Sequence, residues 1–563
     1  MTVKGYAKFL LIMAGLGGLL YGVEVGVIAA ALPYIERTST FNEYQIGWIV
    51  GMALWGSLPS SLVAGLLAEW FGRKKMIVAS ALLFLVSIPV ICASGFFEGG
   101  NFWMMVGGRA MQGAAAGLFG VIVPMYLAEC LDADSRGKGT GMFQLLLTIG
   151  LVFVAVIGFC VTFCIGDAKK VVDAKAIESG IVAFEQKTDA AGKPVWKLGA
   201  DGEPVLDEAG EKIPELALDE SGNPKPKLDK EGKKIADMKK VTFAMIKSWV
   251  PSAQVASWVR AWQMIFLFSC IPGIILFLGA FRLKESSRWL YRKGRKDEAL
   301  ASLAANNGEA KAAEILEEMI AADQAAEAEK AAIAKAAQGD SLFQRKYVYP
   351  FLLAVTILAC NQATGINSVL NYTVDIFKET GMVGVFANFS DLAIKLVNVF
   401  MTIVACALVD KKGRKFLLKL GTGGIIVGLC GVGTVFLAIK SGLVAASMIT
   451  GVVATAFFFM FIAFYAVGPG VCVWLALSEL MPTRIRATGM SIAMIINQGV
   501  SATIASVFPA WVAGWGFAPV FYCLAGFTVV YFVTAAFFLP ETKGRTLEEI
   551  EQYFKTGKMP EKA

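Results

Sequence analysis

The stretch Glu69-Trp70-Phe71-Gly72-Arg73-Lys74-Lys75 separates two apolar runs, and a close copy, Asp410-Lys411-Lys412-Gly413-Arg414-Lys415, separates two others in the second half of the chain. Two further elements recur in the same order. Glu129 and Arg136 return with the same spacing as Glu479 and Arg486, and Glu285-Ser286-Ser287-Arg288 is loosely echoed by Glu541-Thr542-Lys543-Gly544-Arg545. Parallel repeats of this kind are typical of transporters built from two related halves.

The composition places both halves in a membrane. Of the 563 residues, 56% are hydrophobic and only 17% are charged, whereas soluble domains carry about 25% charged residues. The mean hydropathy is +0.61. A chain this apolar cannot bury its surface in soluble cores, so a lipid bilayer is the expected surrounding. The net charge of +7 comes without an aromatic-interleaved basic stripe, and no nucleic-acid partner is expected.

Apolar runs long enough to cross a bilayer recur along the chain. A spanning helix needs about 20 residues, and the run that opens the chain is too long for a signal peptide. The sequence predicts an all-α membrane protein with twelve spans, near residues 6–32, 45–68, 76–95, 102–128, 139–166, 262–282, 347–377, 387–409, 415–438, 443–477, 485–512 and 517–539.

The short loops predict the orientation. Lys and Arg gather in cytoplasmic loops, and alternate loops here are rich in them: Arg73-Lys74-Lys75, Arg136 with Lys138, Lys411-Lys412 with Arg414-Lys415, and Arg484 with Arg486. The opposite loops offer little beyond Arg37, Lys378 and Lys440. The basic loops are therefore expected to be cytoplasmic, and an even number of spans places both termini there too.

Two long polar segments divide the chain. We expect an N-terminal bundle from residues 1–166 and 262–282, an extracytoplasmic insert at 167–261, a cytoplasmic helical linker at 283–346, a C-terminal bundle at 347–539 and a cytoplasmic tail at 540–563. The insert repeats an Asp-x-x-Gly turn at 189–192, 207–210, 219–222 and 229–232, which suggests small hairpins. It is interpreted as a solvated segment, with a small binding or docking module as the alternative.

Several function classes are disfavoured. The chain has no histidine, which removes the usual metal ligand and the usual proton carrier near neutral pH. Its ten cysteines show no metal-ligand spacing, and no Gly-x-x-x-x-Gly-Lys-Ser/Thr loop occurs. An enzyme is therefore not expected, and neither a cofactor nor a metal is.

The repeated acid–base elements predict a gating role. All of them lie at the expected cytoplasmic ends of helices, where such pairs can latch neighbouring helices while the inner face is closed. The predicted latch residues are Glu69, Arg73, Glu129, Arg136, Glu285, Arg288, Asp410, Arg414, Glu479, Arg486 and Glu541.

Taken together, the motifs resemble the sugar porter family of the major facilitator superfamily, which includes bacterial proton–sugar symporters. The resemblance spans nearly everything outside 167–261. It rests on the two Gly-Arg-Lys loops and on 17–22 (GGLLYG), 124–129 (PMYLAE), 285–290 (ESSRWL), 365–367 (GIN) and 540–544 (PETKG). It implies the major facilitator fold, with two six-helix bundles.

Glu24 and Arg109 form the predicted proton site. Both lie roughly 10–12 Å from the outer ends of their spans, where a lone charge costs about 2.5–3.5 kcal/mol. A carboxylate paired with arginine can alternate between an ion-paired anion and a protonated acid. In the symporters that the chain resembles, an acid occupies the Glu24 position, usually Asp, and an Arg the Arg109 position. A structural ion pair without coupling is the alternative.

The resemblance also implies a substrate site made of amides and one aromatic face. Sugar hydroxyls need oriented donors and acceptors, and the ring stacks on an aromatic side chain. The matching residues are Gln144, Asn361, Gln362, Asn367, Asn398, Trp474 and Asn497. Buried amides also serve as glue between helices. Leu151, Asn371 and Gln498 depart from the family pattern, which leaves the particular sugar open. Lys395 is interpreted as snorkelling or pairing with Asp391, with an anionic substrate as the alternative.

The sequence thus predicts a secondary active transporter that imports a monosaccharide or related polyol with a proton by alternating access. An uncoupled facilitator and a transporter-like sugar sensor are the alternatives. The expected partners are the sugar, the proton and the lipid bilayer, and we expect a monomer. The expected location is the cell membrane, as a multi-pass protein.

Overall fold

A computed structural model describes residues 3–130, 133–184, 197, 215–218, 224, 226, 240–309, 311–321, 343–382, 385–473, 480–482, 485–541 and 547–556. Within them the protein is almost entirely helical, and twelve helices or helix pairs are long and apolar enough to cross a membrane. This confirms the predicted all-α membrane protein with twelve spans.

The first half contains six of these spans. Their helices are α1 (Val3–Thr38), α2 (Glu43–Phe71), α3 (Arg73–Ala93), α4 (Phe102–Cys130), α5 (Ala133–Ile165), and α8 (Ser252–Phe268) continued by α9 (Cys270–Ala280). The insert contributes α6 (Ala168–Glu178) and α7 (Phe243–Trp249), and the linker contributes α10 (Ser287–Arg292) and α11 (Lys296–Asn307).

The second half contains the other six. They are α13 (Arg345–Ala363) with α14 (Ile366–Glu379), α15 (Val385–Lys412), α16 (Arg414–Lys440), α17 (Met448–Tyr465) followed by the π-helix η3 (Ala466–Gly470), α19 (Arg486–Trp515), and α20 (Phe517–Val533) followed by the π-helix η4 (Thr534–Phe538). A short helix, α21 (Leu547–Thr556), comes after them.

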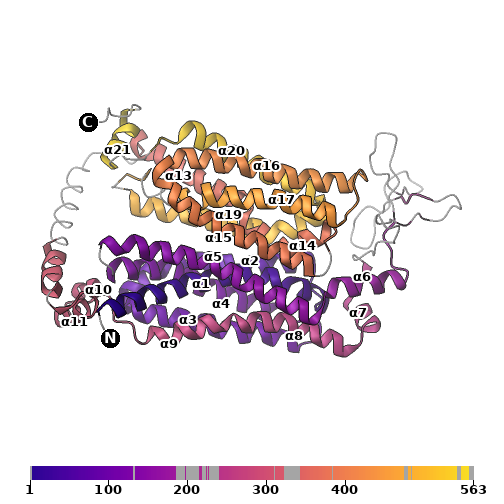
Figure 1. The fold of residues 1–563 in the computed structure, drawn as a ribbon, viewed down its shortest axis with the longest axis horizontal. Helices are drawn as coiled ribbons and strands as arrows, with labels where there is room; N and C mark the ends of the chain where they lie inside the picture. The colour runs from indigo at the N-terminus through magenta and orange to yellow at the C-terminus, as the bar shows by residue number, and fades with distance from the viewer. Residues whose placement is uncertain are drawn as a thin grey trace.

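The two halves lie side by side as two layers of helices, indigo to magenta for the first and orange to yellow for the second (Figure 1). The spans run along the long axis of the view. We call the end that bears α6 and α7 the insert end, and the opposite end, with α10, α11 and α21, the basic end. The start of α1 and the helix α21 both lie at the basic end (Figure 1).

Two spans differ most from the prediction. The span expected at 262–282 begins at Ser252, because apolar residues such as Val255 and Trp258 continue the buried face of α8 upstream. The span expected at 347–377 is broken at Gly365 into α13 and α14. Most of the predicted insert hairpins lie outside the described residues. An isolated antiparallel bridge joins Leu218 to Pro224; the turn predicted at 219–222 lies outside the described residues.

Glycines of the first apolar run let α1 pack against α5 at backbone contact. A Cβ added at Gly18 would lie 2.2 Å from the carbonyl oxygen of Phe143, and one at Gly22 would lie 1.9 Å from that of Leu147. The two glycines are four residues apart and share one helix face, which is the small-residue spacing that allows close helix packing in membranes.

The halves meet through α1 with α14, α2 with α19, and α5 with α15. The detailed contacts lie towards the insert end. A Cβ at Gly47 would touch the carbonyl oxygen of Ser506 at 2.0 Å, and the Trp55 indole donates to the Ser506 hydroxyl at 3.3 Å. Farther along the same helices, Leu54 is buried with Ala502 and Ala505. The two halves are thus in backbone contact near the insert end.

Replacing Gly22 with alanine should destabilise the fold. The new methyl group would overlap a backbone carbonyl of α5, so α1 and α5 must separate, at a cost of about 1–3 kcal/mol. Thermal unfolding in detergent measures this. Gly107→Ala in α4 is the matched control, since a Cβ there meets nothing within 4 Å. Equal melting temperatures for the two variants would contradict the proposed packing.

Candidate functional site

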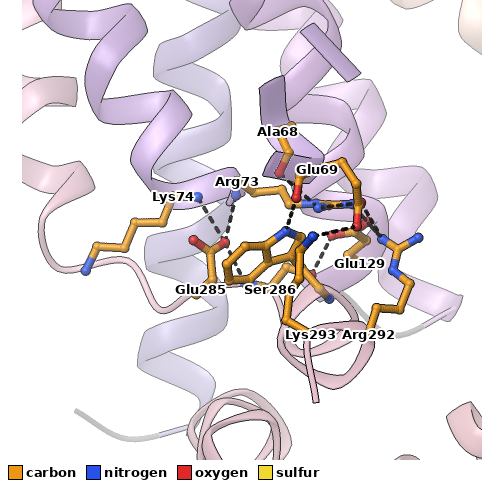
Figure 2. Close-up of polar contacts among 10 residues, drawn as sticks. Ala68, Glu69, Arg73, Lys74, Glu129, Glu285, Ser286, Arg292 and Lys293 are labelled. Carbon is orange, nitrogen blue, oxygen red and sulfur yellow. Dashed lines mark hydrogen bonds and ion pairs between the residues drawn. The ribbon is translucent and has the colours of Figure 1, made fainter. Parts of the chain in front are cut away.

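Arg73 is the centre of a polar cluster at the basic end of the first half (Figure 2). Its side chain is 3% exposed and its guanidinium donates to three groups. These are Glu129 Oε1 at 2.8 Å, Glu69 Oε2 at 3.1 Å and the Ala68 carbonyl oxygen at 3.1 Å. The first bond joins the start of α3 to the end of α4, and the other two join it to the end of α2. One buried cation therefore ties three spans together.

Glu285 caps the N-terminus of α3. Its Oε1 accepts from the backbone N–H groups of Arg73 at 2.9 Å and Lys74 at 3.0 Å. The first N–H groups of a helix have no partner within the helix, and its dipole favours a negative charge there. The turn before α3 is Gly72 with φ 97°, and a Cβ there would lie 2.4 Å from the Glu285 carboxylate. This explains the glycine of the Gly-Arg-Lys loop.

The second half repeats this cap. Glu541 Oε1 accepts from the backbone N–H of Arg414 at 3.1 Å, at the start of α16. The preceding residue, Gly413, has φ 88°, and a Cβ there would lie 2.7 Å from the Glu541 carboxylate. In each half, a glutamate that follows the sixth span therefore caps the N-terminus of the third span.

Other predicted latch residues are placed less fully. The side chains of Arg136, Asp410 and Arg486, and the whole of Glu479, lie outside the described residues. Arg288 is in α10 and partly buried, but the cluster uses other side chains of that segment. The Ser286 hydroxyl donates to Glu129, the Trp289 indole donates to the Glu69 carbonyl oxygen at 2.8 Å, and Arg292 pairs with Glu69 and Glu129 at 3.4 Å each. None of these three is among the predicted latch residues; they follow Glu285 within one or two helical turns.

Glu24 and Arg109 lie together inside the first half. Arg109 Nη2 is 3.9 Å from Glu24 Oε1, and the two side chains are 1% and 4% exposed. This contact is too long for a hydrogen bond, and Glu24 Oε1 has no hydrogen-bond partner among the described residues. Arg109 instead donates to Gln112 Oε1 at 2.5 Å. Gln112 was missed, although its i+3 spacing from Arg109 places it on the same face of α4. The carboxylate is held in an ion pair but keeps free acceptor capacity.

Three predicted amides form one network in the second half. Gln362 Nε2 lies 3.3 Å from Asn497 Oδ1, and Asn367 Nδ2 donates to Gln362 Oε1 at 3.0 Å. Asn367 also donates to the Ser501 hydroxyl at 2.7 Å, and Asn497 to the Leu358 carbonyl oxygen at 2.9 Å. Ser501 was missed; it lies one helical turn after Asn497. The network joins α13, α14 and α19, so a ligand bound here would contact all three helices.

The network surrounds the break in the seventh span. Gly365 has φ 78°, and a Cβ there would lie 2.6 Å from a Leu524 methyl group, so only glycine fits. Around the break, the buried atoms Asn361 Oδ1, Ser368 Oγ and Asn371 Oδ1 have no hydrogen-bond partner among the described residues. Unpaired buried polar atoms are uncommon and suggest a ligand or ordered water. Discontinuous helices build the substrate sites of many transporters.

The remaining substrate candidates are less well placed. Trp474 and the side chain of Gln144 lie outside the described residues. Asn398 is partly exposed in α15, and its carbonyl oxygen accepts from Thr402. One turn away, Lys395 Nζ lies 2.7 Å from Asp391 Oδ2, and the two side chains are 0% and 3% exposed. Lys395 therefore pairs with Asp391 rather than snorkelling outwards.

Comparisons with known proteins agree with this architecture. The profile of the sugar (and other) transporter family matches residues 10–169 and 241–554 and leaves out most of the insert. Among curated relatives, the D-xylose transporter of Levilactobacillus brevis is 24% identical over 551 residues, covering 96% of this chain and 94% of that protein. The arabinose-proton symporter of Bacillus subtilis is also 24% identical, covering 97% and 95%. The probable polyol transporter 3 of Arabidopsis thaliana is 26% identical, covering 97% and 91%.

Solved structures show the same fold. The inward open conformation of the xylose transporter XylE from E. coli aligns with a TM-score of 0.67 at 21% identity, covering 98% of this chain and 99% of that one. This likeness confirms the major facilitator fold. The family match, the twelve spans and the transporter relatives confirm the resemblance that the motifs indicate. The chain belongs to the sugar (and other) transporter family, as a multi-pass protein of the cell membrane and not an enzyme.

Proposed function

We propose that this transporter imports a monosaccharide or related polyol together with a proton, by alternating access. The observation that carries the proposal is the buried Glu24–Arg109 pair. The names of the relatives support the substrate class, since they include a D-xylose transporter, an arabinose-proton symporter and a probable polyol transporter. The orientation predicted from the basic loops makes the basic end cytoplasmic.

Glu24 has the surroundings that a proton carrier needs. The pair is loose at 3.9 Å, and Arg109 has a second acceptor in Gln112. If Glu24 takes a proton, Arg109 therefore keeps a hydrogen-bonded partner and is not left alone in the membrane, where an isolated charge is costly. One proton moving down 100 mV supplies about 2.3 kcal/mol, which allows roughly fifty-fold accumulation of a neutral solute at 1.4 kcal/mol per tenfold.

The amide network is the proposed substrate site. Its amides hold one another in fixed orientations, while the unpaired oxygens of Asn361, Ser368 and Asn371 remain free to accept bonds from sugar hydroxyls. A preorganised site loses little entropy on binding. The neutral amides favour a neutral, hydroxyl-rich ligand. Lys395 and Asp391 form an ion pair that is neutral as a whole. The pair would therefore attract an anion only weakly, which argues against a sugar acid.

We propose that the glutamate caps at the basic end keep each half rigid during the transport cycle. In the described contacts, Glu285 and Glu541 each hold helices of one half together. Alternating access moves one half against the other, so each half must move as a body. We propose that the caps keep the inner ends of each half together while the halves separate at that end.

Replacing Glu24 with glutamine should abolish uphill uptake and leave exchange intact. The amide keeps the shape but cannot take up and release a proton. In proteoliposomes, Glu24→Gln should lose the accumulation driven by a proton gradient and retain counterflow of the preferred sugar from a labelled panel of pentoses, hexoses and polyols. Wild type treated with an uncoupler is the control. If the variant still concentrates sugar, the proton assignment fails; if wild type never does, the protein is a facilitator.

Replacing Asn367 with alanine should weaken substrate binding. It removes the donor to Gln362 and Ser501 and one predicted substrate contact, at about 1.4–3 kcal/mol, or roughly 10- to 100-fold in KM. Thr356→Ala in α13 is the control, because that partly exposed hydroxyl donates to the Leu352 carbonyl oxygen of its own helix. Uptake kinetics provide the measurement. An unchanged KM for Asn367→Ala would remove Asn367 from the site.

Glu285→Gln and Glu541→Gln should have parallel effects. Each removes a negative charge from a helix N-terminus and is expected to cost about 0.3–2 kcal/mol. Thermal unfolding should show a lower melting temperature for both, together with a lower transport rate. Glu298→Gln, which alters an exposed pair with Arg295 in α11, is the matched control. A decrease no larger than that of the control would show that the caps do not stabilise the halves.

A further inference from the structure

Charged side chains bridge the two halves at the insert end. Lys378 Nζ, near the end of α14, lies 3.0 Å from Asp167 Oδ1, the residue that caps α6. Lys169, in the first turn of α6, pairs with Glu379. In both pairs one partner belongs to the first half and the other to the second. The Asp167 and Lys378 side chains are only 6% and 4% exposed, so this is not an ordinary surface contact.

Each side of this bridge is fixed to its own half. In the first half, the Tyr34 hydroxyl of α1 donates to the Gly166 carbonyl oxygen at 2.9 Å, just before Asp167. In α6 itself, Ala168, Val172 and Ala176 are 1%, 0% and 0% exposed. In the second half, the Thr380 carbonyl oxygen, after α14, accepts from Ser447 N and Thr450 Oγ1, both at 3.1 Å. Because each partner is fixed to its own half, moving one half relative to the other would strain these ion pairs.

The surrounding charges strengthen the bridge. Glu36 of α1 and Asp375 of α14 both interact electrostatically with Lys169 and Lys378. Asp173 of α6 interacts with Lys169 and Arg37. Burial is the largest single influence on the pKa of Lys169 and lowers it, but the charge and hydrogen bond of Glu379 together with the charge of Asp173 more than offset it. The pKa is therefore raised, and this lysine stays charged. Acids of the two halves thus share the same two lysines, and separating the halves would leave those acids less compensated.

We propose that α6, the first helix of the insert, is an outer clasp. The clasp is defined as the pairs Asp167–Lys378 and Lys169–Glu379; it holds the insert end shut while the basic end gives access to the substrate. This proposal rests on the alternating-access cycle proposed above. Opening the insert end must separate α14 from α6 and break both pairs. The clasp therefore influences the equilibrium between the two access states. It also couples the start of the insert to the opening of the insert end.

The clasp predicts a graded series of variants. Removing one partner of a buried pair is costly because the other charge loses its compensation, whereas pairs exposed on the surface contribute little. Lys378→Met should have the largest effect, since Asp167, Glu36 and Asp375 all lose a cation. Asp167→Asn and Lys169→Met should each have a smaller effect. Lys169→Met also takes a cation from Glu36, Asp375 and Asp173, but its direct partner Glu379 is 48% exposed and can be hydrated. Lys175→Met is the matched control: it lies in the same helix and pairs only with Glu178, three residues away.

Distances between spin labels across the insert end test the clasp without any substrate. Labels at Phe96→Cys and Leu443→Cys, both 83% exposed, would report one half each, with the exposed Cys160 and Cys164 changed to serine. Lys378→Met should raise the ratio of long to short distances by about tenfold, one step of 1.4 kcal/mol in an equilibrium constant. Distributions for Lys378→Met and Asp167→Asn that equal that of Lys175→Met would overturn the proposal.

A cross-link provides the second arm. A short thiol-specific cross-linker joining Asp167→Cys to Lys378→Cys should stop counterflow, while the same variant without cross-linker, or with each thiol blocked singly, should still exchange. Full transport by the cross-linked protein would refute the clasp. This outcome does not depend on whether the charge variants, such as Lys378→Met, fold well. Because the label distances need neither sugar nor proton gradient, failure of the proposed substrate or coupling would leave this test intact.

Discussion

A bilayer offers no hydrogen-bond partners to the groups buried in it, and this constraint organises the whole protein. Every backbone polar group in the core must be satisfied within its own helix, which explains twelve helical spans and no spanning sheet among the described residues. Every polar side chain in the core must find a partner or be kept for a ligand. Among the described residues, buried charged and amide side chains come together in the Glu24–Arg109 pair, the amide network and the Asp391–Lys395 pair. Because burying polar side chains in a membrane is costly, these three groups are the strongest candidates for functional residues.

The same constraint explains how the halves can move. Within a half, backbone contact at Gly22 and the glutamate caps of α3 and α16 fix the helices to one another. Between the halves, the contacts at the insert end include small residues, such as Gly47 against Ser506, and charged side chains, such as Asp167 with Lys378. Small residues separate without leaving large apolar cavities, and charges near the end of a span can be hydrated when it opens. This arrangement fits the proposed cycle, in which each half moves as a body and the halves separate at their interface.

The predicted and observed sites differ where contacts depend on side-chain direction. The repeated Gly-Arg-Lys loops predicted acid–base pairs at the basic end, and Arg73 lies with Glu69 and Glu129 there. The role of Glu285 is different, because its carboxylate binds backbone N–H groups and not a side-chain cation. Ser286 was quoted only as part of a motif, and Gln112 and Ser501 were missed, because small or neutral polar residues give a weak sequence signal. Each becomes visible once a helix face brings it to a predicted residue.

The sequence by itself determined the membrane class, the number of spans and the two-half repeat, because these depend on apolar length and on local motifs that need no partner. It also identified Glu24 and Arg109, because a charge inside an apolar run is conspicuous wherever its partner lies. Only the tertiary structure decided the break at Gly365, the start of α8 at Ser252, and the clasp between Asp167 and Lys378. The start of α8 depends on its packing against α1, the break at Gly365 on Leu524 of α20, and the clasp on the meeting of α6 with α14. These partners are far apart along the chain, so no local sequence pattern predicts them.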